Sequence, residues 1–104
     1  MKIERWNPEK DGPLSEKALR QKLETLGYRA TRYVYPPGTD FPTHSHEVDK
    51  MDGVLSGQFR ISMGGGSAVL GPGDAVHVPR GVEHSAKVVS DETVVSLDGV
   101  KGSF

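Results

Sequence analysis

The chain has 104 residues, enough for one modest hydrophobic core, so we expect a single domain over residues 1–104. Its 13 basic and 14 acidic side chains nearly balance, which argues against a surface that binds nucleic acid or an anionic membrane. No apolar run is long enough to cross a bilayer, the first residues lack a secretory leader, and cysteine is absent. We therefore expect a cytoplasmic protein without disulfides or thiolate metal sites.

The first 13 residues predict no regular element, because Trp6, Pro8, Gly12 and Pro13 interrupt any period. We interpret Trp6 as an aromatic plug packed over one end of the core, since large aromatic side chains are usually well buried. A lid over a substrate is the alternative role for this side chain.

A helix is predicted over residues 15–26, where Leu19, Leu23 and Leu26 recur at helical spacing. Ser15 is a suitable N-cap residue for this helix. The three leucines form an apolar stripe that we expect to dock the helix on the rest of the domain. A contact across a dimer is the alternative use of the same stripe.

From Tyr28 onward the period changes to two, which predicts strands. The expected strands, separated by glycine and proline turns, cover residues 28–35, 51–56, 59–63, 67–70, 75–78, 85–89 and 93–97. Many short strands with such turns indicate an all-β sandwich or barrel, in which Phe59 and Ile61 are expected in the wall or core. The tail from Asp98 onward carries no clear pattern.

Two of the four histidines lie in His44-Ser45-His46, and strand alternation would place both imidazoles on one face. Neutral imidazole is a common ligand of divalent metals, so the pair can approach one ion. A metal site needs a third ligand, for which His84 is the best candidate if the fold brings it back. We interpret His77 as an exposed or hydrogen-bonded strand residue, with cavity lining as the alternative.

The spacing around the first histidine pair resembles the first motif of the cupin superfamily, which joins a glycine, His-x-His, a glutamate and a second glycine. Gly38, His44, His46 and Gly57 match this motif, whereas Lys50 stands at the place of the glutamate. The departure matters because that glutamate is the family's fourth metal ligand.

The second cupin motif joins a glycine, Pro-x-Gly and a histidine, and Gly73, Pro79, Gly81 and His84 match it at every spacing. Val88 stands where an asparagine usually closes the motif. Both motifs, in order and at a plausible separation, make the resemblance specific, although it covers only about half of the chain.

The resemblance implies an all-β fold, a double-stranded β-helix (jelly-roll) cupin barrel with one N-terminal helix at about residues 15–26. Residues 36–100 would form the core barrel with both motifs, and residues 1–35 the N-terminal segment with the helix and the first strand. Cupins often pair, and the edge strands of an open jelly roll must be covered, so a homodimer is expected.

The resemblance also implies that His44, His46 and His84 bind one divalent metal ion, for which iron, manganese, nickel and zinc are candidates. An ammonium is repelled by a cation, so Lys50 is expected to swing away or to pair with an acid. The remaining candidates for the fourth ligand are water and the neighbouring acids Glu47, Asp49 and Asp52. A cupin that has lost its metal is the alternative.

Two functions from different classes stay open. In the first, the chain is a metal-binding small cupin that acts as a metal-dependent dioxygenase or isomerase on a small organic molecule. In the second, it is a non-catalytic small-molecule-binding or sensing cupin domain, an interpretation favoured by Lys50 and by the lack of a second catalytic group. The sequence does not decide whether the protein is an enzyme, because one barrel hosts many chemistries.

Overall fold

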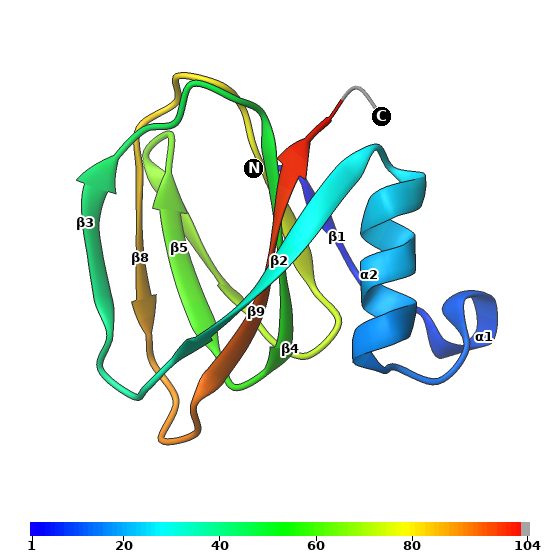
Figure 1. The fold of residues 1–104 in the computed structure, drawn as a ribbon. Helices are drawn as coiled ribbons and strands as arrows, with labels where there is room; N and C mark the ends of the chain where they lie inside the picture. Colours follow the sequence, from blue (N-terminus) through cyan, green and yellow to red (C-terminus); the bar gives the residue numbers. More distant parts are fainter. Residues whose placement is uncertain (103–104) are drawn as a thin grey trace.

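Two antiparallel β-sheets face each other, and a helix lies against the outer side of one of them (Figure 1). The structure, a computed structural model, describes residues 1–102, so Ser103 and Phe104 of the predicted domain lie outside the described residues. In chain order the elements are β1 (Ile3–Glu4), α1 (Pro8–Asp11), α2 (Glu16–Thr25), β2 (Tyr28–Tyr35), β3 (Asp40–His44), β4 (Lys50–Ser56), β5 (Phe59–Met63), β6 (Gly66–Leu70), β7 (Ala75–Val78), β8 (His84–Val88) and β9 (Val94–Lys101).

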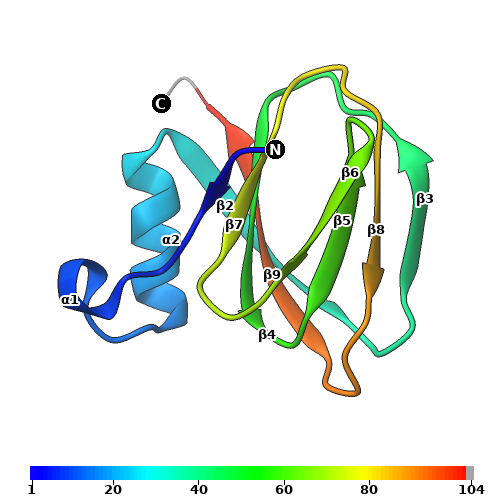
Figure 2. The same ribbon diagram turned by 180° about the vertical axis from the view of Figure 1, so that it is seen from behind.

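The five-stranded sheet has the order β1-β7-β4-β9-β2, and the four-stranded sheet has the order β3-β8-β5-β6. The view from behind shows β7 in the five-stranded sheet and β6 in the four-stranded sheet (Figure 2). Strands that are distant in sequence are therefore neighbours in both sheets. The predicted all-β jelly roll with one N-terminal helix is confirmed.

The main hydrophobic core fills the space between the two sheets. Its buried members are Val54, Phe59, Ile61, Leu70, Val76, Val78, Ala86, Val88 and Val94. On β4 the side chains alternate, so that Val54 enters this core while Met51 and Leu55 face the helix. The two faces of the five-stranded sheet thus serve different layers.

Helix α2 docks through two of its three predicted leucines. Leu19 and Leu23 are buried, whereas Leu26 is 39% exposed because it is the C-cap residue, beyond the last helical turn. Ser15 is the N-cap as predicted, since its Oγ accepts the backbone N–H of Ala18 at 3.0 Å. The apolar stripe packs within the chain, as expected, and not across a dimer.

Opposite the helix, β4 carries a glycine where the two layers come closest. A Cβ on Gly53 would lie 3.2 Å from Leu19 Cδ2, so even a methyl group here would require the leucine to shift. Among residues 1–102, no helix is both long and apolar enough to span a membrane.

The first 13 residues are more regular than expected. β1 pairs with β7, and α1 begins after Asn7, whose Oδ1 accepts the backbone N–H of Glu9. Trp6 is half-buried beside the helix layer and donates its indole N–H to Gly12 O at 2.9 Å. It plugs the outer layer, on the opposite side of the sheet from the inter-sheet space, so the lid interpretation is wrong.

We expect Leu19→Ala to lower the free energy of unfolding by about 2–5 kcal/mol, because it removes a fully buried side chain and leaves a cavity beneath the helix. Leu26→Ala is the matched control and should cost less than about 1 kcal/mol. Urea unfolding followed by circular dichroism measures both. Equal losses in the two variants would contradict this account of helix docking.

Candidate metal centre

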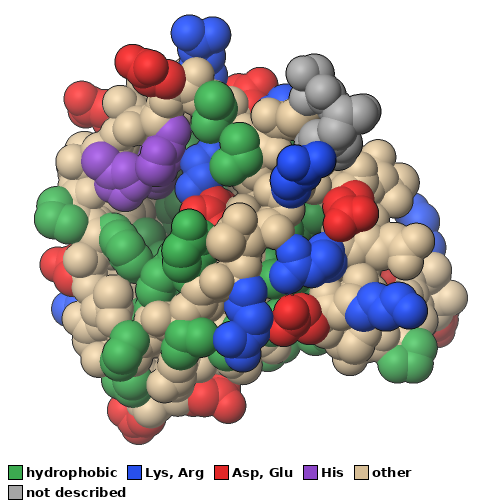
Figure 3. Space-filling view, viewed as in Figure 1, with side chains coloured by type: hydrophobic (Ala, Val, Ile, Leu, Met, Phe, Trp, Pro, Cys, Tyr) green, Lys and Arg blue, Asp and Glu red, His purple; other side chains and the backbone are tan. Residues whose placement is uncertain are grey.

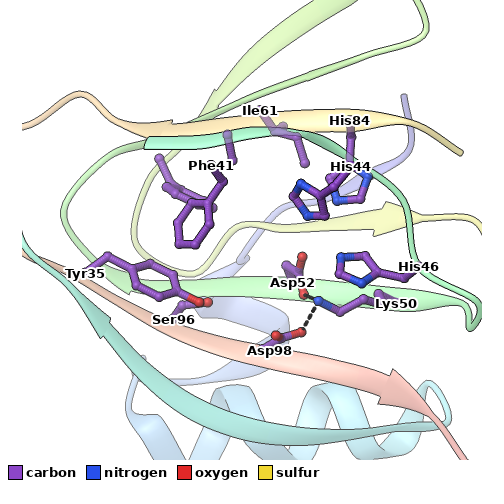
Figure 4. Close-up of a pocket in the computed structure, with 12 residues that line it drawn as sticks. Tyr35, Phe41, His44, His46, Lys50, Asp52, Ile61, His84, Ser96 and Asp98 are labelled. Carbon is purple, nitrogen blue, oxygen red and sulfur yellow. Dashed lines mark ion pairs between the residues drawn. The ribbon is translucent and has the colours of Figure 1, made fainter. Parts of the chain in front are cut away.

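Three of the four histidines converge at one end of the space between the sheets. His44 ends β3 and His84 begins β8, and the two residues are direct cross-strand partners with ring centroids 4.3 Å apart. The ring of His46 lies 4.8 Å from that of His44 and 5.2 Å from that of His84. One ring nitrogen from each histidine lies within 4.8 Å of the other two, and Figure 4 shows the rings facing one another.

The expectation that His44 and His46 share one strand face is wrong in detail. β3 ends at His44, and His46 reaches the cluster from the loop that leads to β4. A register shift between Phe41 and His44 already breaks the regular alternation of this strand. The three histidines do converge as predicted, but His46 joins the other two from a loop and not from a strand.

The turn before β8 holds the loop that carries His46. The backbone N–H of Gly81 donates to His46 O at 2.8 Å, and the N–H of Arg80 donates to Asp49 Oδ1 at 2.7 Å. Gly81 has φ of 77°, which a side chain would disfavour. This residue of the second motif therefore positions a histidine of the first.

Two of the imidazoles are held in a defined tautomer. His44 Nδ1 lies 2.6 Å from Pro42 O, and His84 Nδ1 lies 3.0 Å from Val82 O. A carbonyl oxygen only accepts, so each Nδ1 carries the proton and each Nε2 keeps a free lone pair. Backbone carbonyls that orient histidines in this way are typical of metal sites.

Burial also favours the neutral form of two of these imidazoles, because it lowers their pKa values. It lowers the pKa of His46, and the charge of Lys50 and the neighbouring imidazoles lower it further. Burial lowers the pKa of His84 as well, and this effect outweighs the hydrogen bond to Val82, which raises it. Neutral imidazole is the form that binds a metal.

Beside the histidines, a lysine and two aspartates form a buried trio from neighbouring strands. Lys50 is 7% exposed, and its Nζ lies 2.6 Å from Asp98 Oδ1 and 3.4 Å from Asp52 Oδ1. Asp52 and Asp98 are direct cross-strand partners on β4 and β9 (Figure 4). The expectation that Lys50 pairs with an acid is confirmed, and it pairs with two.

The pKa values of this trio follow from its burial and its charges. Burial would lower the pKa of Lys50, but the carboxylates of Asp52 and Asp98 outweigh it and raise the pKa. Burial, and the proximity of Asp98, raise the pKa of Asp52 well above its usual value. Two carboxylates side by side resist carrying two charges, even with an ammonium between them.

Of the three acids considered as a fourth ligand, only Asp52 faces the inter-sheet space. Glu47 is exposed, and Asp49 accepts the backbone N–H of Arg80. Within residues 1–102, no carboxylate joins the three imidazoles in one cluster of ligand atoms. The candidate site thus offers three nitrogen ligands, and none of the three acids belongs to the cluster.

The histidines and the trio line the polar end of a cavity of about 170 Å³. The rings of Tyr35, Phe41 and Phe59 form its apolar end, with centroids between 4.8 and 6.0 Å apart, next to Ile61. Burial, followed by the nearby carboxylates, raises the pKa of Tyr35 to about 12, so its hydroxyl stays protonated. On the face in Figure 3, histidines reach the surface beside hydrophobic side chains.

Several of these lining residues were not found from the sequence. Phe59 and Ile61 were expected in the wall or core, but Tyr35, Phe41 and Asp98 were not singled out. β9 extends to Lys101, and counting in steps of two from the buried Val94 would have placed Asp98 on the inner face. His77 faces the other side of its sheet, with its ring 6.5 Å from that of Tyr28, so cavity lining is wrong for it.

Comparison with known proteins matches residues 31–100 to a family model described as the cupin domain. The cupin domain of Cnp3 from Schizosaccharomyces pombe has a TM-score of 0.65 at 19% identity, and the alignment covers 74% of this chain but only 54% of that one. KdgF from Halomonas sp. has a TM-score of 0.63 at 24% identity, over 74% and 71%. A cupin protein from Bacteroides fragilis has a TM-score of 0.61 at 28% identity, over 75% and 70%. Comparison with curated proteins gave no match.

We expect Asp52→Asn to reveal the raised pKa of Asp52. Burial and the neighbouring Asp98 raise the pKa of this carboxyl in the folded chain above its value of about 3.9 in the unfolded chain, so this contribution to stability is present at low pH and is lost as the pH rises through the folded-state pKa. Relative to the wild type, the variant should become progressively more stable as the pH rises above about 4. Urea unfolding at a series of pH values measures this difference.

The matched control is Asp40→Asn, which removes a carboxylate from an exposed position on β3. A difference between Asp52→Asn and the wild type that stays constant with pH would show that Asp52 does not hold a proton in the folded state.

Proposed function

This chain belongs to the cupin family, and on that premise we propose that it is a metal-binding small cupin with His44, His46 and His84 as ligands. The convergence of three imidazoles, two of which place Nδ1 against a backbone carbonyl oxygen, is the observation that carries the proposal. Nitrogen ligands at about 2.1 Å from one ion in tetrahedral geometry lie about 3.4 Å apart. The three ring nitrogens lie within 4.8 Å of one another, so binding one ion would draw the imidazoles closer together.

The candidate ions in this proposal are iron, manganese, nickel and zinc: imidazole suits iron, nickel and zinc, whereas manganese would depend more on oxygen ligands such as water. Water is the fourth ligand in this proposal, since Lys50 engages Asp52 and Asp98, and Glu47 and Asp49 point elsewhere. A bound ion with open positions supplies Lewis-acid chemistry at an oxygen atom of a small molecule, or oxygenation if it is redox-active. Dioxygenase and isomerase activities both lie within that chemistry.

The ligand in this proposal is a small organic molecule. The cavity volume of about 170 Å³ is smaller than the roughly 300–1,000 Å³ of sites for drug-sized ligands, which favours a small molecule. The chain's own part is to bind the apolar portion between aromatic rings and to orient polar groups toward the histidines. The aromatic end excludes water from the bound molecule.

A non-catalytic binding or sensing domain is the second candidate. Lys50 occupies the place of the acidic ligand. Its ion pairs engage both nearby carboxylates, which makes them less available as general bases. Elemental analysis of freshly purified protein separates the two functions. Stoichiometric iron or manganese together with turnover of small oxidisable or isomerisable compounds supports the enzyme, and a metal-free protein that binds small molecules supports the second candidate.

We expect His44→Ala, His46→Ala and His84→Ala each to lower zinc affinity at least about tenfold, because two imidazoles hold an ion far less tightly than three. His77→Ala is the matched control, since His77 lies outside the cluster, and it should keep wild-type affinity. Isothermal titration with zinc and metal analysis after dialysis measure the effect. Wild-type metal content in any of the three cluster variants would remove that residue from the site.

We also propose a homodimer in the cytoplasm. β2 lies at the edge of the five-stranded sheet, and Tyr33 and Val34 on this strand are 45% and 50% exposed. Covering such an edge with a second copy would hide unpaired backbone groups and apolar surface.

We expect light scattering at micromolar concentration to give twice the chain mass, and Val34→Lys to shift it toward the monomer. Val69→Lys, at an exposed position of the other sheet, is the control and should leave the mass unchanged. A monomeric wild-type protein would exclude the dimer.

A further inference from the structure

We infer that Lys50, Asp52 and Asp98 make the cavity selective for small organic molecules that are uncharged or positively charged and carry hydrogen-bond donors, and that they disfavour free carboxylates. This inference rests on the proposed function only in taking the cavity as the ligand site. It names the class of ligand that the polar end accepts.

The first support is the balance of fixed charge. Among the described residues that line the cavity, Lys50 is the only lysine or arginine, and Asp52 and Asp98 are the only acids. The trio carries a net charge of −1 when both acids are ionised and 0 when one is protonated. In neither state does the cavity wall offer a spare positive charge to an anionic ligand.

The position of the ammonium gives the second support. Lys50 Nζ lies 2.6 Å from Asp98 Oδ1, the length of a strong charge-assisted contact, and its side chain is buried. An incoming carboxylate would have to share this ammonium with Asp98 and Asp52 and would then lie beside them. Like charges this close in a partly buried site are strongly unfavourable.

The third support is an excess of acceptors. Oδ1 of Asp52 and Oδ1 of Asp98 both contact the Lys50 ammonium, which is the partner that the two carboxyl groups share. An ammonium has three donors, fewer than two carboxyl groups can accept, so a ligand hydroxyl or ammonium that approaches the trio adds a donor where acceptors are in excess. Ligands that carry hydrogen-bond donors are therefore favoured at this end of the cavity.

At the other end, aromatic rings select an apolar group. Tyr35, Phe41 and Phe59 contact one another and line this part of the cavity. In this inference the apolar group of the ligand lies against these rings and its donor points toward the trio. The histidines line the same cavity (Figure 4).

Three probes of nearly equal size, benzylamine, benzyl alcohol and benzoate, test this inference. Protein-detected NMR titration of the full chain, as purified and again after removal of metal by chelation, gives each dissociation constant. In the chelated wild-type protein, benzoate should bind at least about tenfold more weakly than the other two probes. The chelated protein removes any metal that would itself attract a carboxylate.

Two variants should move the preference in opposite directions. Asp98→Asn frees the Lys50 ammonium from its closest partner and should strengthen benzoate binding about tenfold relative to benzyl alcohol. Lys50→Met leaves two acids and should favour benzylamine further. Asp40→Asn makes the same charge change on the exposed face of β3 and should leave all three constants as in the wild type.

Benzoate binding to the chelated wild type as tightly as benzyl alcohol would overturn the inference. So would an unchanged preference in Asp98→Asn and Lys50→Met, or the absence of binding by all three probes at millimolar concentration. If these results came with normal zinc binding, the metal centre would stand and only the ligand class would fall. If zinc binding failed while the probe order held, the ligand class would stand without the metal.

Discussion

The cross-strand pairing of β3 with β8 is the constraint on which the site depends. It places His44 directly opposite His84, so two imidazoles from opposite ends of the barrel sequence lie 4.3 Å apart between ring centroids. A shift of one residue in this register would send one of the two rings to the other face of the sheet. His46 then needs only a loop, braced by Gly81, to complete the cluster.

The five-stranded sheet supplies the charged part of the cavity, again through cross-strand pairing. Lys50 and Asp52 alternate with the helix-facing side chains of β4, and Asp98 is brought beside them by the pairing of β4 with β9. His44 and His84 therefore come from one sheet and the trio from the other, His46 lies on the loop between them, and these groups meet only because the sheets pack together. The helix layer stabilises that packing from outside through Leu19 and Leu23.

Much of this arrangement was predictable from local pattern. Alternation and turn residues predicted most strands, leucine spacing predicted α2, and motif spacing named the three histidines. Two short elements, β1 and α1, were missed because so few residues carry no usable period. Asp98 was missed because the apolar alternation ends at Leu97, whereas β9 continues to Lys101. The last residues of this strand carry no pattern that would predict it.

The sequence by itself determined the chemical types available: three imidazoles in two cupin motifs, no cysteine, and a lysine in place of an acidic ligand. Those facts limit any metal site to nitrogen ligands and water, or to acids whose position the sequence leaves open. Only the tertiary structure decided where the acids lie, because a carboxylate becomes a ligand or an ion-pair partner according to which strand is paired beside it. The 2.6 Å contact between Lys50 and Asp98 joins two strands that are distant in sequence, and no local pattern encodes such a contact.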